Sequence, residues 1–140
     1  MVNRSVVLRK ISHIRHALSR IKAKSKVSLD IFKNDIDSQD IVLYNLQIAI
    51  QACIDIGTHI IADEGWGVAG SFSEVFYVLH NNGVININLT EKMVSMAGLR
   101  NILIHEYEYI NLEAIYNILQ TNLKDIEKFI IAVLGYFKLE

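Results

Sequence analysis

Four side chains able to act on a phosphodiester lie close together in the second half of the sequence. Arg100, Asn101, His105 and Tyr107 fall within eight residues. A guanidinium can contact phosphate through two parallel N–H donors, and imidazole is the side chain whose ordinary pKa lies nearest neutrality. Such groups could cleave a phosphodiester by acid–base chemistry without a metal ion. The segment is therefore the candidate catalytic centre.

The spacing of these residues sets a condition on how they can work together. On an ideal helix Arg100 and Tyr107, seven residues apart, share one face, while Asn101 and His105, four apart, share a neighbouring face. Asn101 is thus placed to orient the ring of His105. All four groups can converge on one substrate if the helix unwinds near Glu106, or if a second subunit completes the site. Both arrangements remain open.

A second polar constellation lies on an otherwise apolar segment, where Tyr44, Gln47, Gln51, Asp55 and His59 follow one another at spacings of three or four. This spacing predicts one narrow polar stripe along a central helix. Asp55 and His59, four apart, could hydrogen-bond to each other. The pair is either structural or, as a further hypothesis, the centre of a helical enzyme of an unrelated type.

Two familiar classes of binding site are excluded by context. The run from Gly65 to Gly70 matches G-x-G-x-x-G, but it follows a predicted helix, whereas a dinucleotide site needs a preceding strand. We therefore expect a loop. The histidines lack zinc-type spacing and Cys53 is the one thiol, so no metal site is expected. Cys53 lies in an apolar run and is expected to be a buried thiol of a protein kept in a reducing compartment.

Composition and charge bear on partners. The 140 residues fit one domain, 1–140, and the chain is 51% hydrophobic with 21% charged residues, which favours a homodimer that covers apolar surface. No leader pattern is recognised and no run approaches the roughly 20 apolar residues of a membrane span, so a cytoplasmic protein without a membrane is expected. Eight of the fourteen Lys and Arg precede Asp30, the first acidic residue. That segregation predicts a positive element, either a solvated face or a phosphate-binding surface.

The fold class follows from periodicity. There is no proline, and apolar residues recur at helical rather than alternating spacing. Helices are predicted over residues 3–23, 39–63, 71–81, 89–105 and 112–137. Their expected N-terminal caps lie in the segment Asp37–Asp40 and at Ser71, Asn88 and Asn111. The sequence thus predicts an all-α, up-and-down bundle of four to five helices.

The candidate centre resembles a known family. Arg100, His105 and Tyr107 match the R-x4-H-x-Y motif of HepT-like toxins in the HEPN superfamily, and Asn101 matches the common R-N start of that motif. Further similarity, over roughly residues 1–115, is carried by the run 44–61, the loop Gly65–Gly70 and the pair Ala97–Gly98.

This resemblance implies a homodimeric HEPN-like bundle in which two motifs meet at a cleft. It implies the toxin of a type VII (HEPN/MNT) toxin–antitoxin system, a metal-independent RNA endonuclease that needs no cofactor. His105 would act as acid and base while the ribose 2′-hydroxyl attacks phosphorus, and Arg100 would stabilise the phosphate charge. A partner MNT nucleotidyltransferase would neutralise the toxin by AMPylation of Tyr107. The alternative is a non-catalytic HEPN subunit that binds a nucleotidyltransferase.

Overall fold

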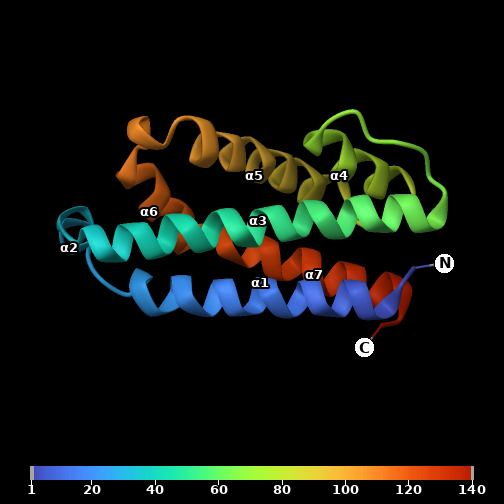
Figure 1. Cartoon of the computed structure of the whole chain (residues 1–140), viewed down its shortest axis with the longest axis horizontal. Coiled ribbons are helices and arrows are strands. Elements are labelled where there is room, and N and C mark those ends of the chain that lie inside the picture. Colours follow the sequence, from blue (N-terminus) through green and yellow to red (C-terminus); the bar gives the residue numbers. More distant parts are fainter. Residues whose placement is uncertain (1, 140) are drawn as a thin grey trace.

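The computed structural model describes residues 2–139, and within them it is entirely helical. Figure 1 shows the long helices lying side by side, with α3 in the middle and α1 running antiparallel to it. The predicted all-α class is confirmed. The described elements are α1 (Arg4–Ser25), α2 (Leu29–Asn34), α3 (Ile36–Glu64), α4 (Phe72–Asn81), α5 (Ile87–His105), the 3-10 helix η1 (Tyr107–Tyr109), α6 (Leu112–Thr121) and α7 (Leu123–Phe137).

Two helix starts differ from those predicted. The cap of α3 is Asp35, whose carboxylate accepts hydrogen bonds from the Ser38 backbone N–H at 3.2 Å and from its hydroxyl at 2.7 Å. The polar residues after Asp35 therefore lie inside the first turns of the helix rather than before it. Likewise Asn86, not Asn88, caps α5 by accepting from the Leu89 N–H. Ser71 and Asn111 cap α4 and α6 as predicted.

The sequence predicted four to five helices, whereas the described residues contain seven α-helices. The short α2 was not predicted. The helix expected over 112–137 is split at Asn122, and Figure 1 shows α6 and α7 running in different directions. The break lets α6 pack against α1 and α2 while α7 packs against α3 and α5. At this break the side-chain amide of Asn122 donates a hydrogen bond to Asp125, in the first turn of α7, at 3.2 Å.

Helix α3 is the axis of the bundle and contacts α1, α2, α4, α5 and α7. By length and composition alone it could cross a membrane, which corrects the prediction that no stretch approaches such a span. Of its most apolar window, 61% is buried inside the protein, as is usual for the core helix of a bundle. Cys53 is fully buried on this helix, and burial raises the pKa of its thiol.

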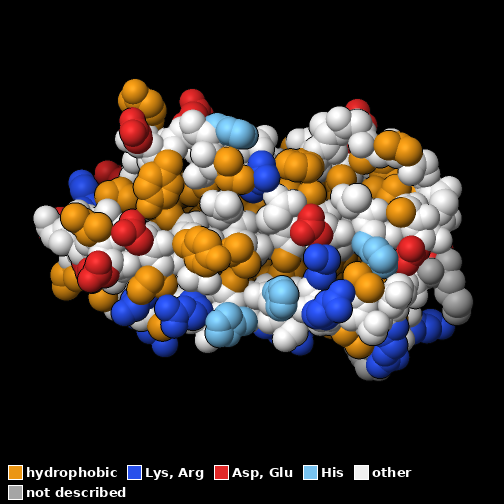
Figure 2. Space-filling view, viewed as in Figure 1, with side chains coloured by type: hydrophobic (Ala, Val, Ile, Leu, Met, Phe, Trp, Pro, Cys, Tyr) orange, Lys and Arg blue, Asp and Glu red, His pale blue; other side chains and the backbone are white. Residues whose placement is uncertain are grey.

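The basic residues segregate in space as they do in the sequence. Helix α1 contains seven of the eight early Lys and Arg, and Lys26 caps its C-terminal end. Figure 2 shows blue side chains gathered along the edge of the molecule where α1 lies in Figure 1. The predicted positive element is therefore present and is helix α1.

Candidate functional site

The C-terminal end of α5 positions the motif residues. The helix ends at His105, the Glu106 N–H donates to Ile102 at 2.9 Å, and the chain then turns into η1 with Tyr107 as its first residue. Unwinding near Glu106, one of the two arrangements left open by the sequence, is thus observed. Tyr107 consequently leaves the helix face that it would otherwise share with Arg100.

Arg100 is held from three directions. Its Nε donates to Gln51 Oε1 of α3 at 2.7 Å, and its Nη1 donates to the side-chain oxygen of Asn101 at 3.2 Å. The guanidinium carbon also lies 4.9 Å from the centre of the Phe72 ring at the start of α4, within the range of a cation–π contact. A guanidinium has five N–H donors. These contacts fix its plane while leaving donors for a phosphate.

The support of Arg100 continues along α3. Gln51 presents its oxygen to Arg100 and donates through Nε2 to Asp55 Oδ1 at 2.9 Å. Asp55 also lies 3.7 Å from the ammonium group of Lys10 on α1. Because an amide has one accepting and one donating end, Asp55 holds Gln51 with its oxygen turned to Arg100. Asp55 therefore contributes to the site through Gln51.

The predicted contact between Asp55 and His59 is not formed. Asp55 is occupied by Gln51, and His59 Nε2 instead lies 2.9 Å from Asp63 Oδ2, one turn further along α3. Each of the two residues has a nearer partner of suitable chemistry. A catalytic centre built on this pair is thus not supported by the geometry.

Asn101 and His105 are exposed on α5, one turn apart. Within residues 2–139 no hydrogen bond joins them, and the Asn101 oxygen is engaged by Arg100. The expected orienting role of Asn101 toward His105 is therefore replaced by a contact with Arg100. The imidazole of His105 remains open to solvent at the end of the helix.

Tyr107 reaches across to the beginning of α3. Its hydroxyl donates to Asp40 Oδ1 at 3.0 Å, and the side chain remains half-exposed. Partial burial, followed by the hydrogen bond and the charge of Asp40, raises the pKa of the phenol. Sequence reasoning missed Asp40 because it read the residue as part of a helix cap.

One face of α3 carries both anchors. Asp40 and Gln51 are eleven residues apart, which is about three turns, so they point the same way and lie roughly 16 Å apart along the axis. Between them projects Tyr44, with 64% of its surface exposed. Helix α3 therefore binds Tyr107 through Asp40 and Arg100 through Gln51. We call this face of α3, with Asp40, Tyr44 and Gln51, the floor of the site.

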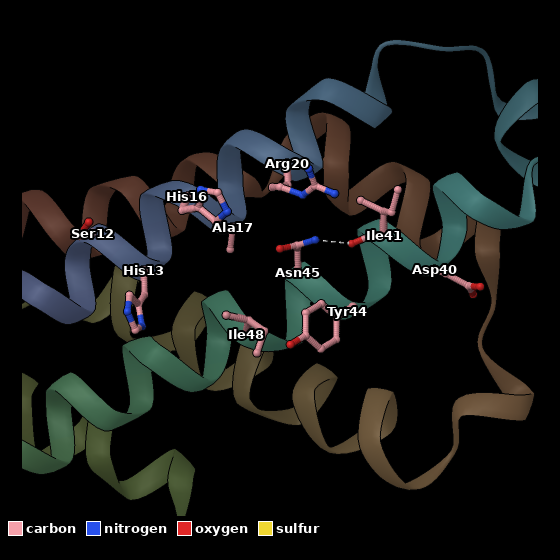
Figure 3. Close-up of a pocket in the computed structure, with 10 residues that line it drawn as sticks. All are labelled: Ser12, His13, His16, Ala17, Arg20, Asp40, Ile41, Tyr44, Asn45 and Ile48. Carbon is pink, nitrogen blue, oxygen red and sulfur yellow. Dashed lines mark hydrogen bonds between the residues drawn. The ribbon is translucent and has the colours of Figure 1, made fainter.

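Tyr44 and Asp40 also border a groove between α1 and α3, with a volume of about 760 Å³ (Figure 3). In Figure 3 His16 and Arg20 extend from α1 toward Asn45 and Ile41 of α3, so one wall is basic and the other amphipathic. The complete lining is Ser12, His13, His16, Ala17, Arg20, Asp40, Ile41, Tyr44, Asn45 and Ile48. Sequence reasoning did not find this groove, although the basic run before Asp30 signalled one of its walls.

The chain is similar to known proteins over most of its length. Residues 14–133 match the family described as "Ribonuclease HepT-like". The mRNA nuclease HepT of Shewanella oneidensis is 35% identical over 125 residues, covering 89% of this chain and 93% of that protein. The tRNA nuclease HepT of Aphanizomenon flos-aquae is 29% identical over 106 residues, covering 76% and 72% respectively.

A solved structure extends the similarity to three dimensions. The tri-AMPylated Shewanella oneidensis HEPN toxin, in complex with an MNT antitoxin, superimposes with a TM-score of 0.86 at 34% identity. The superposition covers 93% of this chain and 97% of that one. The range 14–133 that matches the family contains α3 and α5, which hold the candidate site.

Proposed function

The chain belongs to the HepT-like ribonuclease family, and we propose that it is the toxin of a type VII (HEPN/MNT) pair, a metal-independent RNA endonuclease of the cytoplasm. One observation carries the proposal. Arg100 is fixed by Gln51 at 2.7 Å on the same exposed helix end that presents His105 to solvent. A phosphate-binding cation and an acid–base group thus lie five residues apart on one helix, which supports a role for this segment in the cleavage of RNA.

The proposed reaction is an intramolecular transesterification. A base takes the proton of the ribose 2′-hydroxyl, the oxygen attacks the adjacent phosphorus, and an acid gives a proton to the leaving 5′-oxygen. His105 provides these proton transfers. Arg100 stabilises the negative charge that grows on the phosphoryl oxygens, a contribution of about 3 kcal/mol where a single well-placed donor is removed.

The reaction asks for a base and an acid at once, which favours two copies of His105 and hence a homodimer. Apolar surface around the motif is consistent with a covering partner: Phe72, which lies against Arg100, and Ile102, which lies within the motif on α5, are both exposed. Large exposed apolar side chains that cluster around a polar centre are typical of an interface. We therefore place the second subunit against the exposed end of α5.

The α1–α3 groove gives the RNA a path away from the cut. Tyr44 offers an exposed ring on which a base can stack, and Arg20 offers a cation for the backbone, both within the groove of Figure 3. Base stacking on an aromatic side chain accepts any base, so this groove would hold a flanking single-stranded segment with little sequence preference.

Tyr107 is the proposed site of control. Its side chain is half-exposed at the end of the motif, and the similar toxin from Shewanella oneidensis is AMPylated in its complex with an MNT antitoxin. AMP on Tyr107, transferred by a partner nucleotidyltransferase, adds an anion where RNA phosphates must lie. Sterics and charge repulsion would then exclude the substrate.

Cleavage of labelled RNA by purified protein in EDTA tests the activity. Wild type should cut, whereas His105→Ala and Arg100→Ala should lose at least about 10²-fold in kcat, as expected for a lost acid–base group or a lost charge-stabilising donor. Lys124→Ala, which removes an exposed cation from α7, is the matched control and should cut like wild type. No cutting by unmodified wild type would instead favour the alternative, a non-catalytic subunit that binds a nucleotidyltransferase.

A further inference from the structure

The contact between Tyr107 and Asp40 joins residues that are 67 positions apart in the chain. The phenol donates and the carboxylate accepts at 3.0 Å, within the range required for direct proton transfer. Both side chains are exposed, so a second protein can reach them. The cleavage reaction described above uses neither group for proton transfer, which leaves the pair without an assigned task.

Transfer of AMP to a tyrosine has a definite requirement. A bond forms between the phenolic oxygen and the α-phosphorus of ATP, and the bond from that phosphorus to the bridging oxygen breaks to release pyrophosphate. The phenolic proton must leave in the same process. A phenol holds its proton at neutral pH, and partial burial, together with the hydrogen bond and the charge of Asp40, holds the pKa of Tyr107 above its ordinary value. Attack is therefore helped by an acceptor already in contact with the hydroxyl.

We propose that Asp40 is the catalytic base for nucleotidylation of Tyr107, accepting the hydroxyl proton as the oxygen attacks the nucleotide. The inference rests on the proposed function, since it concerns how the toxin takes part in its own neutralisation. Proton transfer also makes Asp40 neutral at the moment when the AMP phosphate arrives beside it. Repulsion between a carboxylate and the new phosphodiester is thereby removed.

Neighbouring carboxylates do not offer the same contact. Glu106 and Glu108 flank Tyr107 in sequence, and Asp37 lies one turn before Asp40 on α3, yet within the described residues only Asp40 accepts a hydrogen bond from the Tyr107 hydroxyl. Asp40 also lies on the rigid helix α3, which is fixed by contacts with five other helices. A base held in this way keeps its position while the partner binds.

The experiment measures initial rates of AMP incorporation by intact mass spectrometry, using the full-length protein, the partner nucleotidyltransferase and ATP. Asp40→Asn keeps an oxygen that can accept the phenolic hydrogen bond but cannot take up the proton. Its rate should fall by roughly 10²-fold, the lower end of the range for a positioned base. Asp37→Asn, an exposed change on the same helix, is the control and should react at the wild-type rate.

A second variant separates proton transfer from mere positioning. A fluorinated tyrosine at position 107 has a more acidic phenol, so it needs less help from a base and should restore much of the rate lost in Asp40→Asn. Unchanged or faster reaction of Asp40→Asn, or no restoration by the fluorinated residue, overturns the inference while leaving Tyr107 as the modified residue. AMP found on wild type only at other residues overturns the proposed modification together with this inference.

Discussion

Removing the amide of Gln51 should impair cleavage by releasing Arg100 rather than by unfolding the protein. Gln51→Leu deletes the 2.7 Å hydrogen bond to Nε but leaves the contacts of Arg100 with Asn101 and Phe72. A hydrogen bond to a charged group contributes about 1.5 to 3 kcal/mol. The lower end applies because the contact is only partly buried. A loss of about 1.4 kcal/mol at the transition state corresponds to a tenfold fall in kcat.

The assay is single-turnover cleavage of a labelled RNA, with the free energy of unfolding measured in urea alongside it. The KM should change little, because ground-state binding along the groove is unaffected. Gln47→Leu, one turn earlier on the same face, is the control and should cut normally. In an Arg100→Ala background Gln51→Leu should cause no additional loss, since the two residues act as one unit. Independent, additive losses would refute the positioning argument.

A reversed pair provides a rescue. In the double variant Gln51→Glu with Asp55→Asn, the acceptor for Arg100 and the bond between positions 51 and 55 are both retained, while the number of carboxylates is unchanged. Because Gln51 now donates to Asp55 at 2.9 Å, the exchange simply reverses the direction of that bond. The double variant should recover most of the activity lost in Gln51→Leu. Failure to recover, in a protein that folds normally, would show that orientation of Arg100 does not depend on this chain of contacts.

Two further predictions concern the floor of the site. Tyr44→Ala should weaken the affinity for a single-stranded oligoribonucleotide, measured by fluorescence anisotropy, by about 1 to 3 kcal/mol, whereas Tyr44→Phe should bind normally. If Tyr44→Ala binds with the affinity of wild type, the proposal that RNA binds in the groove is refuted. Asp40→Asn should lower the raised pKa of Tyr107 toward the ordinary phenol value, as read from the ultraviolet absorbance difference against Tyr107→Phe. Because the folded pKa is raised, the stability contributed by this contact is complete below about pH 10 and is lost as pH rises through the folded value. An unchanged phenol titration in Asp40→Asn would contradict the share of the pKa shift assigned to Asp40 and would leave burial as its cause.

Local signals in the sequence predicted local structure well. Ser71 and Asn111 cap their helices because a side-chain oxygen and an N–H a few residues later suffice for the contact. The predicted starts of α3 and α5 were wrong because several residues able to cap a helix lie close together there. Their capping preferences are too similar to show which of them is the cap. The break at Asn122 was missed because the apolar period continues through it. Its cause is tertiary, since α6 and α7 pack on different helices.

The candidate site divides in the same way. The motif and the polar face of α3 are visible in the sequence because each is a pattern within one segment. Their connection is not, since Arg100 meets Gln51 across 49 positions and Tyr107 meets Asp40 across 67. Such pairings depend on the register in which α5 packs along α3 and on the point where the chain leaves the helix after His105. Periodicity fixes which face is polar but not which residue on it meets which partner.

The same arrangement indicates how modification would stop the nuclease. Arg100 and Tyr107 are anchored about three turns apart on a single rigid helix, so AMP on Tyr107 need not displace Arg100. The attached nucleotide would occupy the floor beside Tyr44, which is the path proposed for RNA. Inhibition would then act by excluding substrate while the support of Arg100 by Gln51 persists. Modified protein should accordingly keep its fold and its stability but fail to bind RNA, and a loss of the contact between Arg100 and Gln51 in the modified form would point instead to distortion of the catalytic group.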